Sequence, residues 1–304
     1  MKSKRVLILI LFLFILSFTL VACDNSKPAD SGTNSNISAT DEEPSEPDKP
    51  SETTEKYTKT ELTLSRGDLK IYGVIYVPTD KKEKMPTVIL SHSAQLTHKS
   101  MDSYCVEFAS RGFVAYAFDF CGGSANSKSS GKVDEMTVFT EVEDLKAVID
   151  QILSLDYVDG NNLYLFGSSQ GGLVSSITAS DEPELIKGLI LLYPAFNIPD
   201  EVKRFENSGF SGIGAIAYGQ AFMDTIKDYD VYSKIASYTG RVLILHGSRD
   251  SMVNISYSEK AISAFQNAEL VVVKGANHGF NKQNYSFFGN YDSIVWKSID
   301  KFLS

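Results

Sequence analysis

Residues 163–179 read LYLFGSSQGGLVSSITA, an apolar run followed by three glycines that surround two adjacent serines. The run predicts a short buried strand, and the stretch after the glycines predicts a helix. Glycine is unfavourable inside regular structure, so its presence here indicates a turn in which side chains would collide. Gly167 and Gly171 lie two residues on either side of Ser169, which places that serine at the tip of a sharp strand–turn–helix unit.

The frame Gly-X-Ser-X-Gly between a strand and a helix is typical of a nucleophile elbow. It holds the Ser169 hydroxyl above the sheet at a helix N-terminus, where backbone N–H groups favour negative charge. We therefore predict Ser169 as a nucleophile and the N–H of Gln170 as an oxyanion donor. Ser168 is a flanking residue in this frame, and Gly172 allows the helix to approach the strand closely. The alternative is a turn with a purely structural role.

A serine hydroxyl needs a base, and the base needs a third group that orients it. In this arrangement the chain order is serine, acid, histidine, and two of the four histidines follow Ser169. His278 follows an apolar strand pattern in the loop GANHGF, where an imidazole can lean back over the sheet, so we predict it as the base. His246 lies inside the strand pattern RVLILHG and is expected to be a packed strand-end residue.

The acid is expected in the loop after the preceding strand, and Asp250 in HGSRDSMV occupies that place. It would fix the tautomer of His278 and stabilise the imidazolium. Asp119, at the end of the strand pattern FVAYAFDF, is the alternative, although it precedes the serine and carboxylates at strand ends commonly order loops. A second oxyanion donor should follow the strand pattern TVILSH, and the N–H of Ala94 is our candidate.

From Tyr57 onward, strand and helix patterns alternate, which is typical of a mostly parallel sheet covered by helices on both faces. The pattern is lost over about 196–238, where glycines and aromatic residues indicate a cap insertion over the carboxyl edge of the sheet. The expected strands are 58–64, 70–77, 87–91, 113–120, 163–166, 188–193, 242–246 and 270–274. The expected helices are 101–111, 137–155, 170–180, 255–265 and 291–303.

The first 56 residues differ from the rest of the chain. Residues 1–22 combine basic residues, an apolar run and small residues, which is the pattern of a secretory signal peptide. Their ending resembles the lipobox of bacterial lipoproteins, which implies a lipid on Cys23; an ordinary signal peptide with a chance cysteine is the alternative. Residues 23–56 are acidic and proline-rich and are expected to form a disordered tether. We therefore expect an exported protein, anchored to a membrane and facing the extracytoplasmic side.

The net charge of −9 at pH 7, without a basic stripe, argues against a nucleic-acid partner. Besides Cys23 there are two cysteines, and an exported protein can pair Cys105 with Cys121 in a disulfide. Two buried thiols are the alternative. No cluster of Cys, His and Asp has metal-ligand spacing, so neither a metal nor another cofactor is expected. The expected oligomeric state is a monomer or a small homo-oligomer.

These motifs resemble the α/β-hydrolase superfamily over nearly all of residues 57–304. A closer resemblance is to bacterial cinnamoyl/feruloyl esterases and related acyl hydrolases. The resemblance implies the α/β-hydrolase fold, with a mostly parallel sheet of eight-stranded type, helices on both faces and a small cap insertion. It also implies ester hydrolysis through an acyl-enzyme. The stretches that carry it are FDFCGGSANSKSSGKVDEMTVFTEVEDLKAVIDQI at 118–152, LYLFGSSQGG at 163–172, LILHGSRDSMV at 243–253 and GANHGF at 275–280.

The chain departs from the esterase pattern at two places. The oxyanion loop of those relatives reads His-Gly-Phe and here reads His92-Ser93-Ala94, which changes the acyl pocket. Their elbow usually reads Gly-His-Ser-Gln-Gly-Gly, and Ser168 replaces its histidine, with little chemical consequence expected. The resemblance implies that the cap binds an aromatic acyl group. A small core within the cap is the alternative role for the aromatic residues that could line such a pocket: Phe196, Phe205, Phe210, Tyr218 and Phe222.

Together these features predict a lipid-anchored serine hydrolase that acts on small-molecule carboxylic esters, including aromatic acyl esters such as cinnamoyl or feruloyl esters. A peptidase or acyl-aminoacyl hydrolase of the same fold is the alternative enzyme, because it would share Ser169, Asp250 and His278. A lipoprotein that binds a ligand without catalysis is the alternative from another class.

Overall fold

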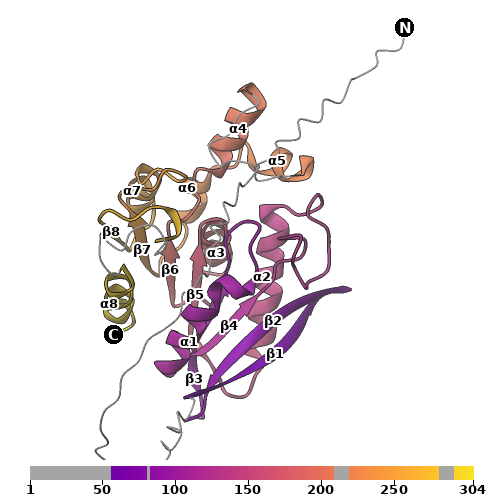
Figure 1. Ribbon diagram of the computed structural model, residues 1–304, viewed down its shortest axis with the longest axis vertical. Helices are drawn as coiled ribbons and strands as arrows, with labels where there is room; N and C mark the ends of the chain where they lie inside the picture. The colour runs from indigo at the N-terminus through magenta and orange to yellow at the C-terminus, as the bar shows by residue number, and fades with distance from the viewer. Residues whose placement is uncertain (1–55, 81–82, 209–218, 281–290) are drawn as a thin grey trace, which may run out of the picture. The chain divides into compact units, whose positions relative to one another are not determined.

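The computed structural model describes residues 56–80, 83–208, 219–280 and 291–304. Its strands form one sheet in the order β1-β2-β4-β3-β5-β6-β7-β8 (Figure 1). β2 pairs antiparallel with both β1 and β4, and every other pair in the sheet is parallel. The prediction of a mostly parallel sheet is confirmed. The strand bounds are β1 Tyr57–Arg66, β2 Leu69–Pro78, β3 Met85–Ser91, β4 Val114–Phe118, β5 Val158–Ser168, β6 Gly188–Leu192, β7 Arg241–Gly247 and β8 Ala268–Val273.

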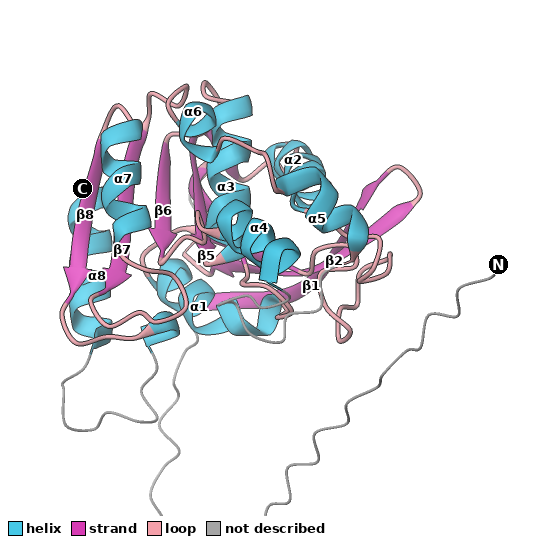
Figure 2. Cartoon of the chain, turned by 90° about the horizontal axis from the view of Figure 1, so that it is seen from above, coloured by secondary structure: helices cyan, strands magenta, loops and turns pink. Residues whose placement is uncertain are grey.

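The described helices are α1 Asp102–Ser110, α2 Val138–Leu153, α3 Gln170–Asp181, α4 Ile198–Ser208, α5 Gln220–Ile226, α6 Val231–Ile235, α7 Ser256–Ala264 and α8 Tyr291–Leu303, with 3-10 turns η1 His98–Met101 and η2 His278–Phe280. They cover both faces of the sheet (Figure 2). Alternation along β3 shows why three consecutive residues at its centre are apolar: Ile89 packs in the cluster with α2, α3 and α7, whereas Val88 and Leu90 pack in the cluster with α1 and α8.

The segment between β6 and β7 contains the part of the chain predicted as an insertion. α4 contacts α5, α5 contacts α2, and α6 contacts both α3 and α7. Figures 1 and 2 both show α4 and α5 beside one another. These short helices therefore join the layer on that face of the sheet through their apolar side chains, among them Phe222 and Ile235.

The turn from β5 into α3 forces Ser169 into a strained backbone conformation, with φ 51° and ψ −117°. A Cβ at Gly167 would collide with the backbone carbonyl of Gly171, and a Cβ at Gly171 would collide with the carbonyl of Ser91 in β3. The carbonyl of Ser169 accepts hydrogen bonds from the N–H groups of Gly172, Leu173 and Ala195. Glycine at two positions thus makes the turn possible, and three hydrogen bonds hold it.

β5 is longer than the strand predicted at 163–166, because it begins at Val158. The register shifts between the pair Met85–Val158 and the pair Thr87–Leu163, so the polar residues between Val158 and Leu163 are accommodated as an irregularity in the pairing. Their polar sequence gives no strand pattern, so periodicity alone does not predict this extension of β5.

Helix α2 carries two buried acids. Its N-terminus is closed by a capping box in which Thr137 and Thr140 exchange hydrogen bonds. The carboxyl group of Glu141 is buried and accepts a hydrogen bond from the side-chain amide of Gln170 at 2.8 Å. Asp144 is also buried, and it accepts from Arg66 at 2.7 Å. These acids therefore tie α2 to the elbow and to β1.

The two cysteines of the described part are free and buried, so the open choice is settled in favour of thiols. Burial raises the pKa of Cys105 well above its ordinary value and raises the pKa of Cys121 to about 12. Both are therefore protonated and unreactive near neutral pH. Among the helices that the structure describes, none is long and apolar enough to cross a membrane.

The buried acid on α2 generates a prediction about pH. Burial raises the pKa of Glu141 to about 8, above its ordinary value of 4.5. Its contribution to stability is therefore complete below pH 4.5 and is lost as the pH rises towards 8, with a slope of at most about 1.4 kcal/mol per pH unit. In Glu141→Gln the amide stays uncharged, so the melting temperature should fall less between pH 5 and 8 than in the wild type.

The matched control is Glu143→Gln, since Glu143 is an exposed acid in the same turn of α2. Its melting temperature should follow the wild-type pH dependence. If Glu141→Gln also followed the wild-type curve, the buried carboxyl would already be ionised in the folded protein.

Candidate active site

Three loops bring a serine, a histidine and an aspartate together. Nε2 of His278 lies 3.1 Å from Oγ of Ser169, and Nδ1 of the same ring lies 2.7 Å from Oδ2 of Asp250. Ser169 comes from the turn between β5 and α3, Asp250 from the segment between β7 and α7, and His278 begins η2 after β8. The carboxyl ends of parallel strands meet at one edge of a sheet, which is why residues far apart in sequence converge there.

The surroundings of Asp250 keep its carboxylate ionised. Oδ1 accepts hydrogen bonds from the N–H groups of Met252 and Val253, both at 2.9 Å. Burial opposes ionisation, but the hydrogen bonds from His246, His278 and Val253 outweigh it and lower the pKa of Asp250 well below its ordinary range. An ionised carboxylate can only accept, so Nδ1 of His278 donates to it. In the neutral ring, Nε2 is then free to accept the hydroxyl proton of Ser169.

His246 contributes more than its sequence pattern indicated. It is fully buried at the end of β7, as expected for a packed strand-end residue. Its Nε2 also lies 3.2 Å from Oδ2 of Asp250 and 2.9 Å from the carbonyl of Val253, while Nδ1 lies 2.7 Å from Oγ of Ser258. The carbonyl can only accept, so Nε2 carries a proton and also points towards Asp250. The spacing of four residues in HGSRD was the available signal for this contact.

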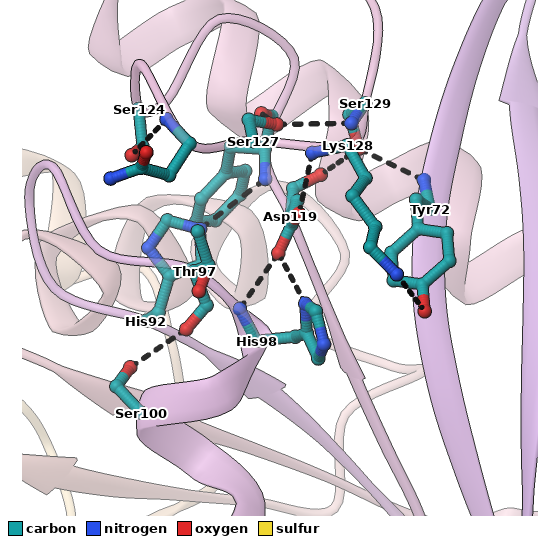
Figure 3. Close-up of polar contacts among 12 residues, drawn as sticks. Tyr72, His92, Thr97, His98, Ser100, Asp119, Ser124, Ser127, Lys128 and Ser129 are labelled. Atoms are coloured by element: carbon teal, nitrogen blue, oxygen red, sulfur yellow. Dashed lines mark hydrogen bonds and ion pairs between the residues drawn. The ribbon is translucent and has the colours of Figure 1, made fainter.

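Asp119 contacts His98 rather than His278. Its Oδ1 accepts from the N–H of His98 at 2.7 Å and lies 2.6 Å from Nδ1 of that ring, and its Oδ2 accepts from the N–H of Lys128 at 2.8 Å (Figure 3). Burial opposes ionisation, but these hydrogen bonds lower the pKa of Asp119. The carboxylate thus orders the loops after β3 and β4, and Asp250 is the acid that reaches His278.

The two predicted oxyanion donors lie close to the nucleophile. Gln170 is the first residue of α3, so its N–H belongs to the helix N-terminus beside Ser169. Ala94 lies in a tight turn closed by a hydrogen bond from the N–H of Leu96 to the carbonyl of Ser93 at 3.1 Å. Gln95 completes this turn in the left-handed region, with φ 57°. Ala94, Ser169 and His278 line the same cavity, whose volume is about 1100 Å³.

The predicted aromatic pocket is not built from the cap residues that the structure describes. Phe196 and Phe222 are buried in the hydrophobic core, and Phe205 is 43% exposed on α4. None of the three is among the residues that line the cavity beside Ser169. For Phe196 and Phe222 the reason is that burial of their rings in the core stabilises the packing of the insertion. Phe210 and Tyr218 lie outside the described residues. The aromatic residues that do line this cavity are Tyr104, Tyr193, Phe280 and Trp296.

Among the described residues, no group of three or more His, Cys, Asp or Glu side chains is placed to hold a metal ion.

Solved structures share this fold. Est1E from Butyrivibrio proteoclasticus, solved with ferulic acid bound, is 24% identical, with a TM-score of 0.67 over 80% of this chain and 98% of that chain. A putative dienelactone hydrolase from Klebsiella pneumoniae is 17% identical, with a TM-score of 0.62 over 81% of this chain and 98% of that chain. Both confirm the predicted α/β-hydrolase fold.

Curated proteins match over shorter stretches. The uncharacterized protein YcjY of Escherichia coli is 25% identical over 158 residues, which is 50% of each chain. The quorum-quenching protein AidA of Acinetobacter baumannii is 24% identical over 127 residues, or 41% of this chain and 40% of that protein. The chain therefore spans about half the length of the curated relatives it matches, or less.

The family model described as the prolyl oligopeptidase family matches residues 99–295. This range is well over half of the chain and contains Ser169, Asp250 and His278. The chain therefore belongs to the prolyl oligopeptidase family.

Proposed function

We propose that this chain is a serine hydrolase that cleaves carboxylic esters through an acyl-enzyme intermediate. The observation that carries the proposal is the hydrogen-bonded series from Ser169 through His278 to Asp250, with distances of 3.1 and 2.7 Å. The strained backbone of Ser169 supports it further, because strain of this kind is typical of functional sites.

In the proposed mechanism Ser169 attacks the ester carbonyl while Nε2 of His278 removes its proton. Asp250 holds the ring in the required tautomer and stabilises the imidazolium that forms. The N–H groups of Gln170 and Ala94 donate hydrogen bonds to the oxyanion that develops on the carbonyl oxygen. His278 then returns the proton to the departing alcohol, which leaves the acyl group on Ser169. A water molecule attacks the acyl-enzyme by the same steps, with His278 as the base, and releases the acid.

Two substrate classes remain within this mechanism. The likeness of the fold to Est1E, which was solved with ferulic acid, supports small aromatic acyl esters as substrates. The family description supports a peptidase or acyl-aminoacyl hydrolase as the second candidate. We favour esters, because the four motif stretches quoted from the sequence resemble those of cinnamoyl/feruloyl esterases. Cleavage of a peptide bond also requires a general acid in the site, since the amine must be protonated before it can leave.

Substitution of Ser169 tests its role as the nucleophile. Wild-type protein should hydrolyse p-nitrophenyl acetate and methyl ferulate with a higher kcat/KM than aminoacyl p-nitroanilides. Ser169→Ala should lower kcat for the esters by at least about a thousandfold, because it removes the attacking oxygen. A fluorophosphonate probe should label the wild type and leave Ser169→Ala unlabelled. An unlabelled, ester-inactive wild type would favour a ligand-binding protein without catalysis, and a preference for the anilides would favour the peptidase.

Asp250 and Asp119 are expected to have different roles. Asp250→Asn should lower kcat about a thousandfold or more while the protein stays folded, because the amide no longer fixes the tautomer of His278. Asp119→Asn should act mainly on stability, since its carboxylate binds the backbone of His98 and Lys128. Steady-state kinetics and melting temperatures of both variants provide the measurement. If Asp119→Asn stayed folded and lost more kcat than Asp250→Asn, Asp119 would be the catalytic acid and Asp250 the residue that orders loops.

We further propose that the protein is exported and anchored to a membrane through a lipid on Cys23. The support is the sequence pattern of residues 1–22, and this segment lies outside the described residues. In cells fed an alkyne fatty acid, the wild type should take up the label and sediment with membranes, whereas Cys23→Ser should do neither. A wild type that is unlabelled and stays in the supernatant would exclude the anchor.

A further inference from the structure

Two serines beside the nucleophile contact each other. Oγ of Ser93 lies 2.8 Å from Oγ of Ser168 and 3.3 Å from the carbonyl oxygen of Ser168. Ser93 belongs to the loop after β3, and Ser168 is the last residue of β5, directly before Ser169. The esterase pattern has glycine and histidine at these positions, so the two departures from that pattern meet in space.

Tyr193 extends this contact towards the histidine. It follows β6 with φ 39°, an uncommon conformation for a bulky residue, and its side chain interacts with that of Ser168. Burial raises the pKa of Tyr193, so the phenol keeps its proton near neutral pH. Its ring packs against His278 with a centroid distance of 4.5 Å. Tyr193 thus lies between His278 and the contact of Ser168 with Ser93.

The loop after β3 carries an oxyanion donor. The carbonyl of Ser93 accepts the N–H of Leu96, which closes the turn around Ala94. It also lies 2.8 Å from Nδ1 of His92, whose Nε2 accepts from the N–H of Phe120 at 3.3 Å. Burial lowers the pKa of His92, so the neutral ring donates from Nδ1 to Ser93. Ser93 is therefore held at its carbonyl by His92 and at its hydroxyl by Ser168.

We propose that Ser93, Ser168 and Tyr193 are positioning residues that fix the N–H of Ala94 relative to Ser169. The proposal rests on the hydrolase function proposed above. A hydrogen bond between Ser93 and Ser168 sets the separation of the two loops, because Ala94 and Ser169 each directly follow one of the bonded residues. A donor held in advance at the position of the oxyanion needs no reorganisation in the transition state. On this proposal, the exchange of the elbow histidine for Ser168 acts on the oxyanion donor, whereas the sequence pattern predicts little chemical consequence.

The test is a double-mutant cycle of Ser93→Ala and Ser168→Ala, read out with p-nitrophenyl acetate and with a trifluoromethyl ketone, whose adduct carries the oxyanion. Each single variant should lower kcat by about tenfold, less than the loss of a whole oxyanion donor, with little change in KM. The ketone should bind more weakly by a similar factor. The double variant should be no worse than either single variant, because both exchanges remove the same contact.

Two variants isolate the hydroxyl groups. Tyr193→Phe keeps the ring against His278 and should lower kcat in the same direction, whereas Ser168→Thr keeps the hydroxyl and should restore most of the activity lost in Ser168→Ala. Ser110→Ala, an exposed serine on α1 outside the cavity lining, is the control and should behave as wild type. Additive losses in the cycle, or a lower melting temperature with unchanged kcat and ketone affinity, would overturn the proposal.

The outcomes separate this proposal from the function on which it rests. If the wild type hydrolyses esters through Ser169 and the cycle is additive, only the positioning role fails. If the wild type does not turn over esters but a fluorophosphonate labels Ser169, the ester assignment fails, and the labelling rate becomes the readout of the same cycle. Labelling rates that are equal in all four proteins of the cycle then overturn the positioning role.

Discussion

The site depends on one backbone constraint, the left-handed conformation that Ser169 adopts between β5 and α3. The conformation is unfavourable for serine and persists because close backbone packing and hydrogen bonds around the turn hold it in place. Side chains at Gly167 and Gly171 would collide with backbone carbonyls, one of them in β3. The carbonyl of Ser169 accepts three N–H groups, including that of Ala195 after β6. Three neighbouring strands of the sheet thus hold one hydroxyl at its edge.

Three buried carboxyl groups in this fold differ in charge because they differ in hydrogen-bond donors. Asp250 receives two backbone N–H groups and the ring of His278, and its pKa is lowered despite burial. Asp119 receives a comparable set and serves to order loops. Glu141 receives the amide of Gln170, and burial raises its pKa to about 8. Burial opposes ionisation in all three: the donors around Asp250 and Asp119 outweigh it, whereas the amide of Gln170 does not outweigh it at Glu141.

Hydroxyl groups connect the loops that the carboxylates do not reach. The elbow contributes Ser168, which contacts Ser93 from the loop after β3 and interacts with Tyr193, the residue after β6. Such contacts join segments that are far apart in sequence. Each of them contributes less to the stability of the fold than the burial of one aromatic ring does. Their effect is on geometry: a displacement of one loop by a fraction of an ångström would separate Ala94 from the oxyanion it is proposed to bind.

Local sequence determined the strand–turn–helix around Ser169, the alternation that gives a mostly parallel sheet, and the candidates Asp250 and His278. These follow from glycine sterics, from periodicity and from chain order, which are all visible along the chain. Tertiary structure alone decided that Asp250 reaches His278 while Asp119 turns to His98, that Phe196 and Phe222 pack in the core, and that Ser93 touches Ser168. The physical reason is that such contacts depend on how strands align in register and how helices pack, and a linear pattern carries no record of those distances.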